Sequence, residues 1–172
     1  MDAASELDRG LRALRPPPAD VAAVEQLVLR LPGEARETPT RLRLDPEAGA
    51  VGDRWAASLV PKIDAQVTLM RADVARLLGD PPAFGDNLLV TIDTGATNLP
   101  PGTVLRVGSA RCVVTPKPHT GCAKFARRSS DVARAVLASA DWRPAQLRGV
   151  HLRVLEAGDV AVGDAVRVES RP

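Results

Sequence analysis

The chain has 172 residues, of which 45% are hydrophobic and 26% charged, a composition typical of a soluble globular domain. Two cysteines are too few for a disulfide framework, so we expect a reducing, cytoplasmic location. The net charge is +2 and the four aromatic residues include no tyrosine, which argues against a nucleic-acid partner bound by base stacking. No apolar run is long enough to span a membrane, and the first residues lack the order of a signal peptide, so no membrane partner is expected.

The N-terminal segment predicts a short amphipathic helix followed by a linker. Three leucines fall on one helical face between residues 5 and 14, and Ser5 could cap the helix. The triple proline at 16–18 cannot continue a helix and favours an extended chain. We therefore expect residues 1–23 to be a helix and proline-rich linker outside the main domain, residues 24–169, and deletion of residues 1–18 to leave that domain folded.

The rest of the chain predicts many short strands. Residues 21–31 fit both a helical and a strand period, and we assign a strand to 25–31. Helices are expected at 71–78 and at 131–140, the second capped by Ser130. Further strands are expected at 41–44, 66–70, 87–92, 104–107, 110–115, 147–155 and 165–168, the last two joined by turns at Gly158 and Gly163. The pattern predicts a mainly β fold with helical additions (α+β), built on a small β-barrel.

Residues 115–128 carry the strongest sign of chemistry. They contain Cys122, His119 and four cations, and no acidic residue occurs between Asp93 and Asp131. A thiol among cations is biased toward the thiolate, the form that attacks electrophiles and binds metals. Thr120 could also cap a helix over 121–128, which would place the sulfur in the first turn, where the helix dipole favours negative charge.

The same segment has a structural interpretation. Free cysteines are often small buried hydrophobic residues, and basic stretches are usually solvated faces. The two cysteines can nevertheless be told apart. Cys112 alternates with Ala110 and Val114 on one face of a predicted strand, which indicates a core position, whereas Cys122 follows a glycine among cations.

The segment offers residue types for several catalytic and binding chemistries. A zinc site would need Cys112, His119, Cys122 and His151 together, but their spacing matches no zinc pattern. A nucleophilic pair of Cys122 with either histidine fits the residue types but has no local signature. The glycine-rich nucleotide motifs are absent. The residues alone predict a thiolate in an anion-binding pocket that could bind a soft metal or carry sulfur.

Six segments, in order, resemble the MOSC domain, the module named for the C-terminal part of molybdenum-cofactor sulfurases. The resemblance covers residues 24–169, and its departures include Gly121, where proline is common, and Asp86, where glutamate is usual. The segments are Gly-Asp-Arg at 52–54, Gln-Val-Thr-Leu at 66–69, Gly-Asp-Asn-Leu at 85–88, the turn and strand at 99–108, His-Thr-Gly-Cys at 119–122 and the closing segment at 148–164.

The resemblance implies a barrel-like fold and a role in molybdenum-cofactor chemistry. It makes Cys122 the metal ligand or sulfur carrier and the catalytic residue. The cofactor-binding residues that it implies are Arg54, Asn87, Lys117, His119, Thr120, Lys124 and Arg127. No pyridoxal-phosphate site is expected, because the chain has no room for the desulfurase domain of the larger sulfurases.

Two classes of function follow from this resemblance, and a third possibility is that the pocket holds some other anion. The first is a molybdenum-dependent oxidoreductase of N-hydroxylated compounds that receives electrons from a redox partner protein. The second is a non-catalytic carrier that hands cofactor or sulfur to a molybdoenzyme.

Overall fold

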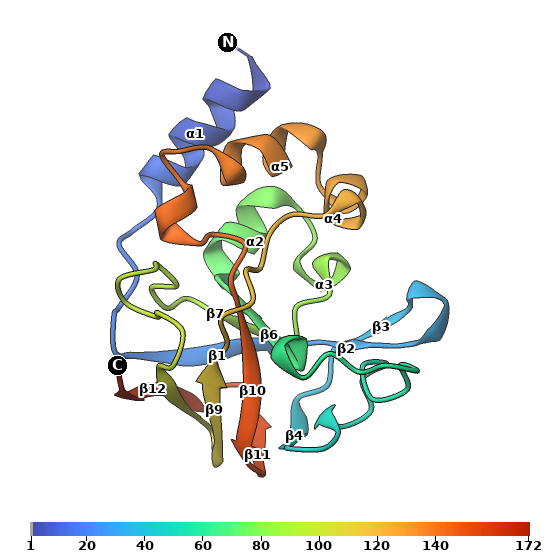
Figure 1. Cartoon of the computed structure of the whole chain (residues 1–172). Coiled ribbons are helices and arrows are strands. Elements are labelled where there is room, and N and C mark those ends of the chain that lie inside the picture. The colour runs from blue at the N-terminus through green and yellow to red at the C-terminus, as the bar shows by residue number, and fades with distance from the viewer. Residues whose placement is uncertain (1) are drawn as a thin grey trace.

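A computed structural model of the chain describes residues 2–172, which form a closed β-barrel with helices gathered at one end (Figure 1). This arrangement confirms the predicted barrel-like α+β fold. Neighbouring barrel strands are antiparallel except for β6 and β7, which are parallel. Around the barrel the strands follow the order β1 (Val21–Leu27), β12 (Ala165–Ser170), β8 (Val104–Val107), β9 (Ala110–Val114), β10 (Val150–Glu156), β6 (Val67–Met70) and β7 (Leu88–Val90), which returns to β1.

Two small sheets flank the barrel. The first has the order β11 (Gly158–Ala161), β4 (Arg41–Asp45) and β5 (Gly49–Ala50). The second is the hairpin of β2 (Leu29–Arg30) and β3 (Arg36–Glu37), which projects from the side of the barrel in Figure 1. A single 3₁₀ turn over Pro32–Glu34 forms the tip of this hairpin.

The helices are α1 (Ala3–Ala13), α2 (Ala72–Leu78), α3 (Pro81–Phe84), α4 (Ala123–Arg128) and α5 (Asp131–Ala138). Further 3₁₀ turns lie at Ile63–Ala65 and Arg143–Ala145. Ser130 caps α5 as predicted, because its hydroxyl accepts a hydrogen bond from the Ala133 N–H. None of the helices within residues 2–172 combines the length and apolar character needed to cross a membrane.

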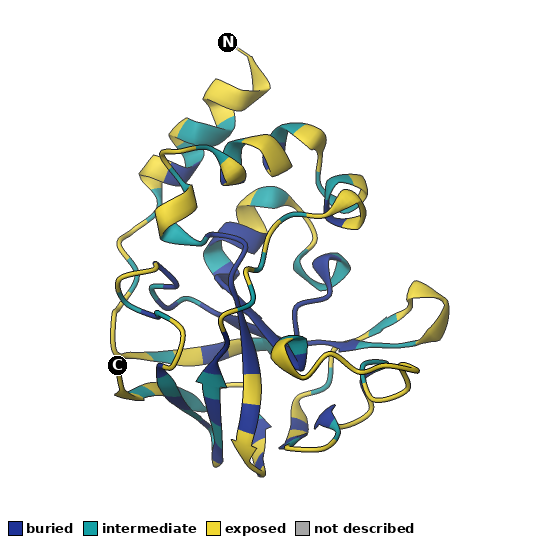
Figure 2. Ribbon diagram, viewed as in Figure 1, coloured by how far each residue is buried: buried dark blue, intermediate teal, exposed yellow. Residues whose placement is uncertain are grey.

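Two apolar clusters form the core. The first fills the barrel with aliphatic side chains and with Cys112, whose inward position confirms the predicted alternation along its strand. The second lies between the barrel and the helices and includes Leu11, Phe84 and Phe125. Figure 2 shows this division, with buried barrel strands below a helical layer whose outer faces are exposed. The second cluster forms part of the support for the functional site.

Several predicted boundaries were wrong, for local reasons. Helix α1 begins at Ala3 because the Ser5 N–H donates to the Asp2 carboxylate, so Asp2 and not Ser5 is the cap. The first barrel strand starts at Val21, four residues earlier than expected. Gly158 opens strand β11 where a turn was predicted. A Cβ there would lie 2.3 Å from the Ala110 backbone nitrogen, so the residue is glycine because two strands approach closely.

The boundary between residues 1–23 and 24–169 stays a prediction, although the contacts of α1 bear on it. Leu11 is buried in the second apolar cluster, and the Asp8 carboxylate accepts a hydrogen bond from the Trp142 indole. Residues Val21 to Ala23 also pair with β12 in the barrel. We therefore expect removal of the N-terminal segment to lower stability measurably.

Candidate functional site

A pocket of about 180 Å³ is lined by residues of helices α3 and α4, of strands β2, β6 and β10 and of the adjoining loops. It opens beside a hollow of about 390 Å³ that shares Arg30, Arg54 and Ala65 with it. The pocket is lined by Arg30, Arg54, Ala65, Thr68, Phe84, Gly85, Asp86, His119, Cys122, Lys124, Phe125, Arg128, Arg148 and His151. These residues come from distant parts of the sequence, and barrel closure brings them together.

Cys122 lies exposed on the pocket wall, at the N-cap position of α4. The prediction that Thr120 caps this helix was wrong, because the helix begins only at Ala123. Burial raises the pKa of the Cys122 thiol, but the backbone N–H groups of Phe125 and Lys124 and the charge of Arg148 outweigh it, so the pKa is lowered overall. The pocket therefore offers an accessible thiol biased toward thiolate.

A cluster of buried polar side chains forms the inner wall of the pocket. The Arg148 guanidinium donates from Nη1 to the Asp86 carboxylate and lies 4.7 Å from the centre of the Phe125 ring. The His119 Nε2 atom is 3.6 Å from Asp86 Oδ1, and the His119 and His151 rings lie 4.3 Å apart, centre to centre. An acid, a guanidinium and two imidazoles thus share one desolvated space.

Desolvation controls the protonation of this group. Burial and the Arg148 charge hold the pKa of His119 well below its usual range. Burial, Lys117 and Arg148 lower the pKa of His151 to about 4. Burial also raises the pKa of Asp86, although Arg148 opposes this. Both imidazoles are consequently neutral near pH 7, and each has one nitrogen able to accept a proton or hydrogen bond.

Several buried polar atoms of the pocket residues have no hydrogen-bond partner anywhere in residues 2–172. Such atoms are rare in folded proteins, because leaving a buried polar group unpaired costs about 1–3 kcal/mol. Their concentration on one pocket indicates a site built for a polar ligand. The atoms are Asp86 Oδ1, His119 Nδ1, Arg148 Nε and His151 Nδ1; Arg128 Nη2 also forms no well-aligned hydrogen bond, although it lies 3.2 Å from a Glu34 carboxylate oxygen.

Behind the pocket, a buried carboxylate positions Arg30. Asp53 accepts from both Nε and Nη2 of Arg30, at 3.0 and 2.8 Å, and from the Arg30 backbone N–H. Asn87 donates its amide to Asp53 at 3.0 Å and to the Val28 carbonyl at 3.1 Å. Two residues of the Gly-Asp-Arg segment therefore have different roles at the site. Asp53 holds Arg30 in place through hydrogen bonds, whereas Arg54 lines the pocket.

The structure brings together half of the binding and catalytic residues predicted from sequence. Arg54, His119, Cys122 and Lys124 line the pocket. The other four do not. Asn87 lies behind the wall, and Lys117 lines a separate open hollow of about 530 Å³ with Lys62 and Asp64. Thr120 and Arg127 are exposed and lie outside the lining of the pocket.

Five ionisable lining residues were missed as binding residues: Arg30, Asp86, Arg128, Arg148 and His151. Asp86 and Arg148 belong to segments that carry the family resemblance, so their motifs offered a signal. His151 lies in the closing segment of the resemblance, and its residue type indicated only a zinc ligand or a base. Nothing in the local sequence marks Arg30, whose place depends on a buried aspartate 23 residues away.

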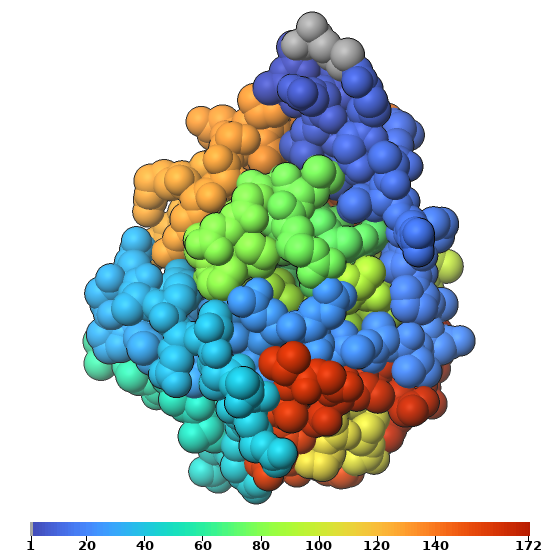
Figure 3. Space-filling model, turned by 180° about the vertical axis from the view of Figure 1, so that it is seen from behind, coloured from blue at the N-terminus to red at the C-terminus, as the bar shows by residue number. Residues whose placement is uncertain are grey.

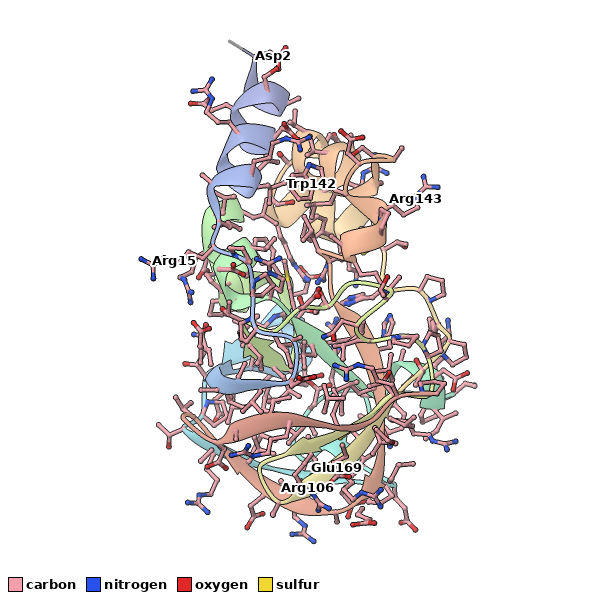
Figure 4. The ribbon with its side chains drawn as sticks, turned by 90° about the vertical axis from the view of Figure 1, so that its left-hand side faces the viewer. Asp2, Arg15, Arg106, Trp142, Arg143 and Glu169 are labelled. Atoms are coloured by element: carbon pink, nitrogen blue, oxygen red, sulfur yellow. The ribbon has the colours of Figure 1, made fainter. Side chains whose placement is uncertain are left out.

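Arg106 and Arg111, the first two cations of the acid-free run between Asp93 and Asp131, do not line the pocket. Arg106 and Arg111 lie on the β8–β9 hairpin, where Glu169 accepts from both Nε atoms at 2.7 Å. Figure 4 places Arg106 and Glu169 at the end of the barrel opposite the helices, far from Trp142. An acid-free run in sequence is not acid-free in space, since Glu156 and Glu169 arrive from other strands.

Sequence comparison identifies the family of this chain. The model of the MOSC domain matches residues 50–167, which is more than half of the chain. The chain belongs to the MOSC domain family. This family is generally linked to binding of the molybdenum cofactor. No protein of curated function matches the chain in sequence.

Solved structures support the MOSC fold. The YuaD protein from Bacillus subtilis is 20% identical, with a TM-score of 0.58 over 88% of this chain and 97% of that one. YiiM from Escherichia coli is 20% identical, with a TM-score of 0.54 over 91% and 72%. YiiM from Geobacillus stearothermophilus is 14% identical, with a TM-score of 0.53 over 91% and 76%. At these identities, the likeness establishes the shared fold alone.

Proposed function

We propose that this MOSC domain binds the molybdenum cofactor in the pocket beside Cys122, with the Cys122 sulfur as metal ligand or sulfur carrier. The observation that carries the proposal is the joint presence of an accessible, acidified thiol and several buried polar atoms without partners on one pocket. A soft thiolate suits a metal that already has sulfur ligands. Among residues 2–172, no three or more His, Cys, Asp or Glu side chains could hold a metal ion by themselves.

The residues present fit the parts of such a cofactor. Its phosphate would be held by the rim cations Arg54, Lys124 and Arg128, since charge-assisted hydrogen bonds favour a dianion. Its ring heteroatoms would meet Asp86 Oδ1 and Arg148 Nε, an acceptor and a donor that are buried without partners. The adjoining hollow gives the pocket room to extend past Arg54 toward Trp55.

In the oxidoreductase form of this proposal, the chain's own groups bind, orient and exchange protons. When bound, the cofactor supplies a metal centre that takes up or releases two electrons. The Cys122 thiolate would hold the metal, and the neutral His119 could exchange a proton at Nδ1 with a bound N-hydroxylated substrate. Electrons would come from a separate redox partner protein.

The exposure of Cys122 favours a second candidate, a carrier of sulfur or cofactor. A sulfur atom at the pocket wall with open access could be reached by an acceptor protein without opening the fold. The two candidates differ in what the loaded protein does. A reductase converts an N-hydroxylated compound when given electrons, whereas a carrier activates a cofactor-free molybdoenzyme without turnover of its own.

The test is the molybdenum content of protein purified from a cofactor-producing host. Wild type should contain molybdenum, and Cys122→Ser should retain only a small fraction of it, because a hydroxyl is a poor soft ligand. Cys112→Ser is the matched control and should keep its molybdenum, since that sulfur is buried in the barrel. Equal molybdenum in wild type and Cys122→Ser would refute the ligand role, and molybdenum-free wild type would refute cofactor binding.

A further inference from the structure

Arg30 on β2 and Arg36 on β3 differ in whether their guanidinium groups have acceptors. The side edge of Arg30, formed by Nε and Nη2, binds the Asp53 carboxylate through both nitrogens. The same edge of Arg36 is buried, yet neither Nε nor Nη2 has an acceptor within the described part of the chain. This two-nitrogen edge matches the geometry of carboxylate and phosphate oxygens. Arg36 is therefore a hydrogen-bond donor oriented to bind an oxyanion, and residues 2–172 do not supply that oxyanion.

The Arg36 side chain is held in place by its own hairpin. Its Nη1 atom donates to the Glu34 and Ala35 carbonyls at 3.0 Å each. The opposite edge faces Gly85, which lines the pocket. A Cβ on residue 85 would lie 3.1 Å from Nη2 and 3.2 Å from Nε, and the φ of +77° at this residue also favours glycine. Glycine thus keeps a side chain away from the two unpaired donors.

The charges around this edge are unbalanced. Six cations (Arg30, Arg36, Arg54, Lys124, Arg127 and Arg128) lie near two acids (Glu34 and Asp53), an excess of four positive charges. Burial and the charges of Arg128, Arg54 and Arg30 lower the pKa of Arg36. A bound dianion would relieve this repulsion.

Glu34 partly fills that role from within the chain. Its carboxylate lies 3.2 Å from Arg128 Nη2 and 3.7 Å from Lys124 Nζ, both on α4. The backbone at Glu34 has a φ of 63°, a left-handed conformation that glycine or asparagine adopts with less strain. Figure 3 shows the hairpin segment next to the α4 segment on the outer face of the molecule. The Arg128 Nη2 atom still lacks a well-formed hydrogen bond.

We propose that Arg36 and Arg128 form an oxyanion subsite at the rim of the pocket, and that the Glu34 carboxylate is its internal competitor, displaced when a ligand oxyanion binds. The shared ligand chemistry is that of a phosphate or carboxylate group. This inference rests on the proposed function only for the source of that group, which would be the phosphate of the cofactor or an anionic group of the substrate. Removing the positive charge of Arg36 or Arg128 should then weaken oxyanion binding, whereas removing the negative charge of Glu34 should strengthen it.

The experiment measures binding of inorganic phosphate by calorimetry to the full chain prepared without cofactor, at constant ionic strength set by chloride. Arg36→Ala and Arg128→Ala should each weaken binding roughly tenfold or more, since each removes a charge-assisted contact. Arg143→Ala is the control for an exposed arginine, because Arg143 donates to the Ala138 carbonyl and lies outside the pocket lining. Arg36→Lys keeps the charge and removes the two-nitrogen edge, so it should also bind phosphate weakly even if Arg36→Ala does not fold.

Glu34→Gln distinguishes a competitor from an ordinary surface ion pair. Removing the competing charge should tighten phosphate binding several-fold, whereas Glu37→Gln, on the same hairpin, should leave it unchanged. The proposal is overturned if wild type and Glu34→Gln both fail to bind phosphate, if Glu34→Gln binds more weakly, or if Arg36→Lys binds as wild type does. Molybdenum retention that depends on Cys122 would survive that outcome, so the two proposals fail separately.

Cofactor-loaded protein separates the two sources of oxyanion. If the subsite holds the cofactor's phosphate, loaded wild type should no longer bind inorganic phosphate. If it holds a substrate's anionic group, loaded wild type should bind phosphate as the cofactor-free protein does. Phosphate binding by loaded protein that is insensitive to Arg36→Lys would overturn the assignment.

Discussion

The two ends of the barrel both carry arginines, but only one end leaves them short of acceptors. At the end far from the helices, Arg106 and Arg111 share Glu169, and Glu156 adds a second acid. At the helical end, buried nitrogens of Arg36 and Arg148 have no hydrogen-bond partner among the described residues, and Arg128 pairs with the exposed Glu34. Arginine content therefore does not mark the candidate site. Burial combined with missing acceptors does, because desolvated donors are costly unless a ligand completes them.

The two cysteines also differ in burial, and the difference in their rates of alkylation is the largest effect that we expect. Burial raises the pKa of Cys112 to about 12, whereas the pKa of Cys122 is lowered. Brief iodoacetamide treatment of the native protein at pH 7 should label Cys122 faster than Cys112 by roughly a hundredfold or more, because only the thiolate reacts and Cys112 must first be exposed. Mass spectrometry of the labelled peptides measures the ratio. Preferential labelling of Cys112 would show that Cys122 is not the reactive sulfur.

Removing one acid from each end should separate their energetics. Asp86→Ala leaves the buried Arg148 charge unpaired, so we expect the free energy of unfolding to fall by about 3–5 kcal/mol. Glu169→Gln, the control at the other end, breaks an exposed network and should shift the midpoint of thermal unfolding by a few degrees at most. Urea and thermal unfolding of both variants provide the comparison. Equal losses of stability would mean that the Asp86–Arg148 pair contributes no more to folding than the exposed network does.

The histidines predict a pH dependence that belongs to the pocket end alone. Because the folded pKa of His151 is about 4 and the unfolded value is near 6.5, the unfolded chain binds the proton first as the pH falls. This residue should therefore cost about 3 kcal/mol of stability between pH 6.5 and pH 4, and that loss should be missing in His151→Gln. Urea unfolding at pH 7, 5.5 and 4 measures the difference. Parallel curves for both proteins would contradict the desolvated placement of His151.

The sequence predicted those features of fold and site that depend on local pattern. Alternation placed Cys112 inside the barrel and left Cys122 as the accessible sulfur, and the Ser130 cap followed from residue type and position. Motifs also named Arg54 and His119, which do line the pocket. These predictions hold because side-chain period, capping and motif identity are readable within a few residues of the site concerned.

Only the tertiary structure decided which charged groups meet. A strand of five residues crosses much of a small barrel at about 3.3 Å per residue, so Arg111 and Lys117 end in different surroundings despite their closeness in sequence. Closure of the barrel also brings Arg30, Asp86, Arg148 and His151 to one pocket from three separate segments. Whether an arginine is neutralised by an acid or left for a ligand depends on such long-range contacts, which no local pattern specifies.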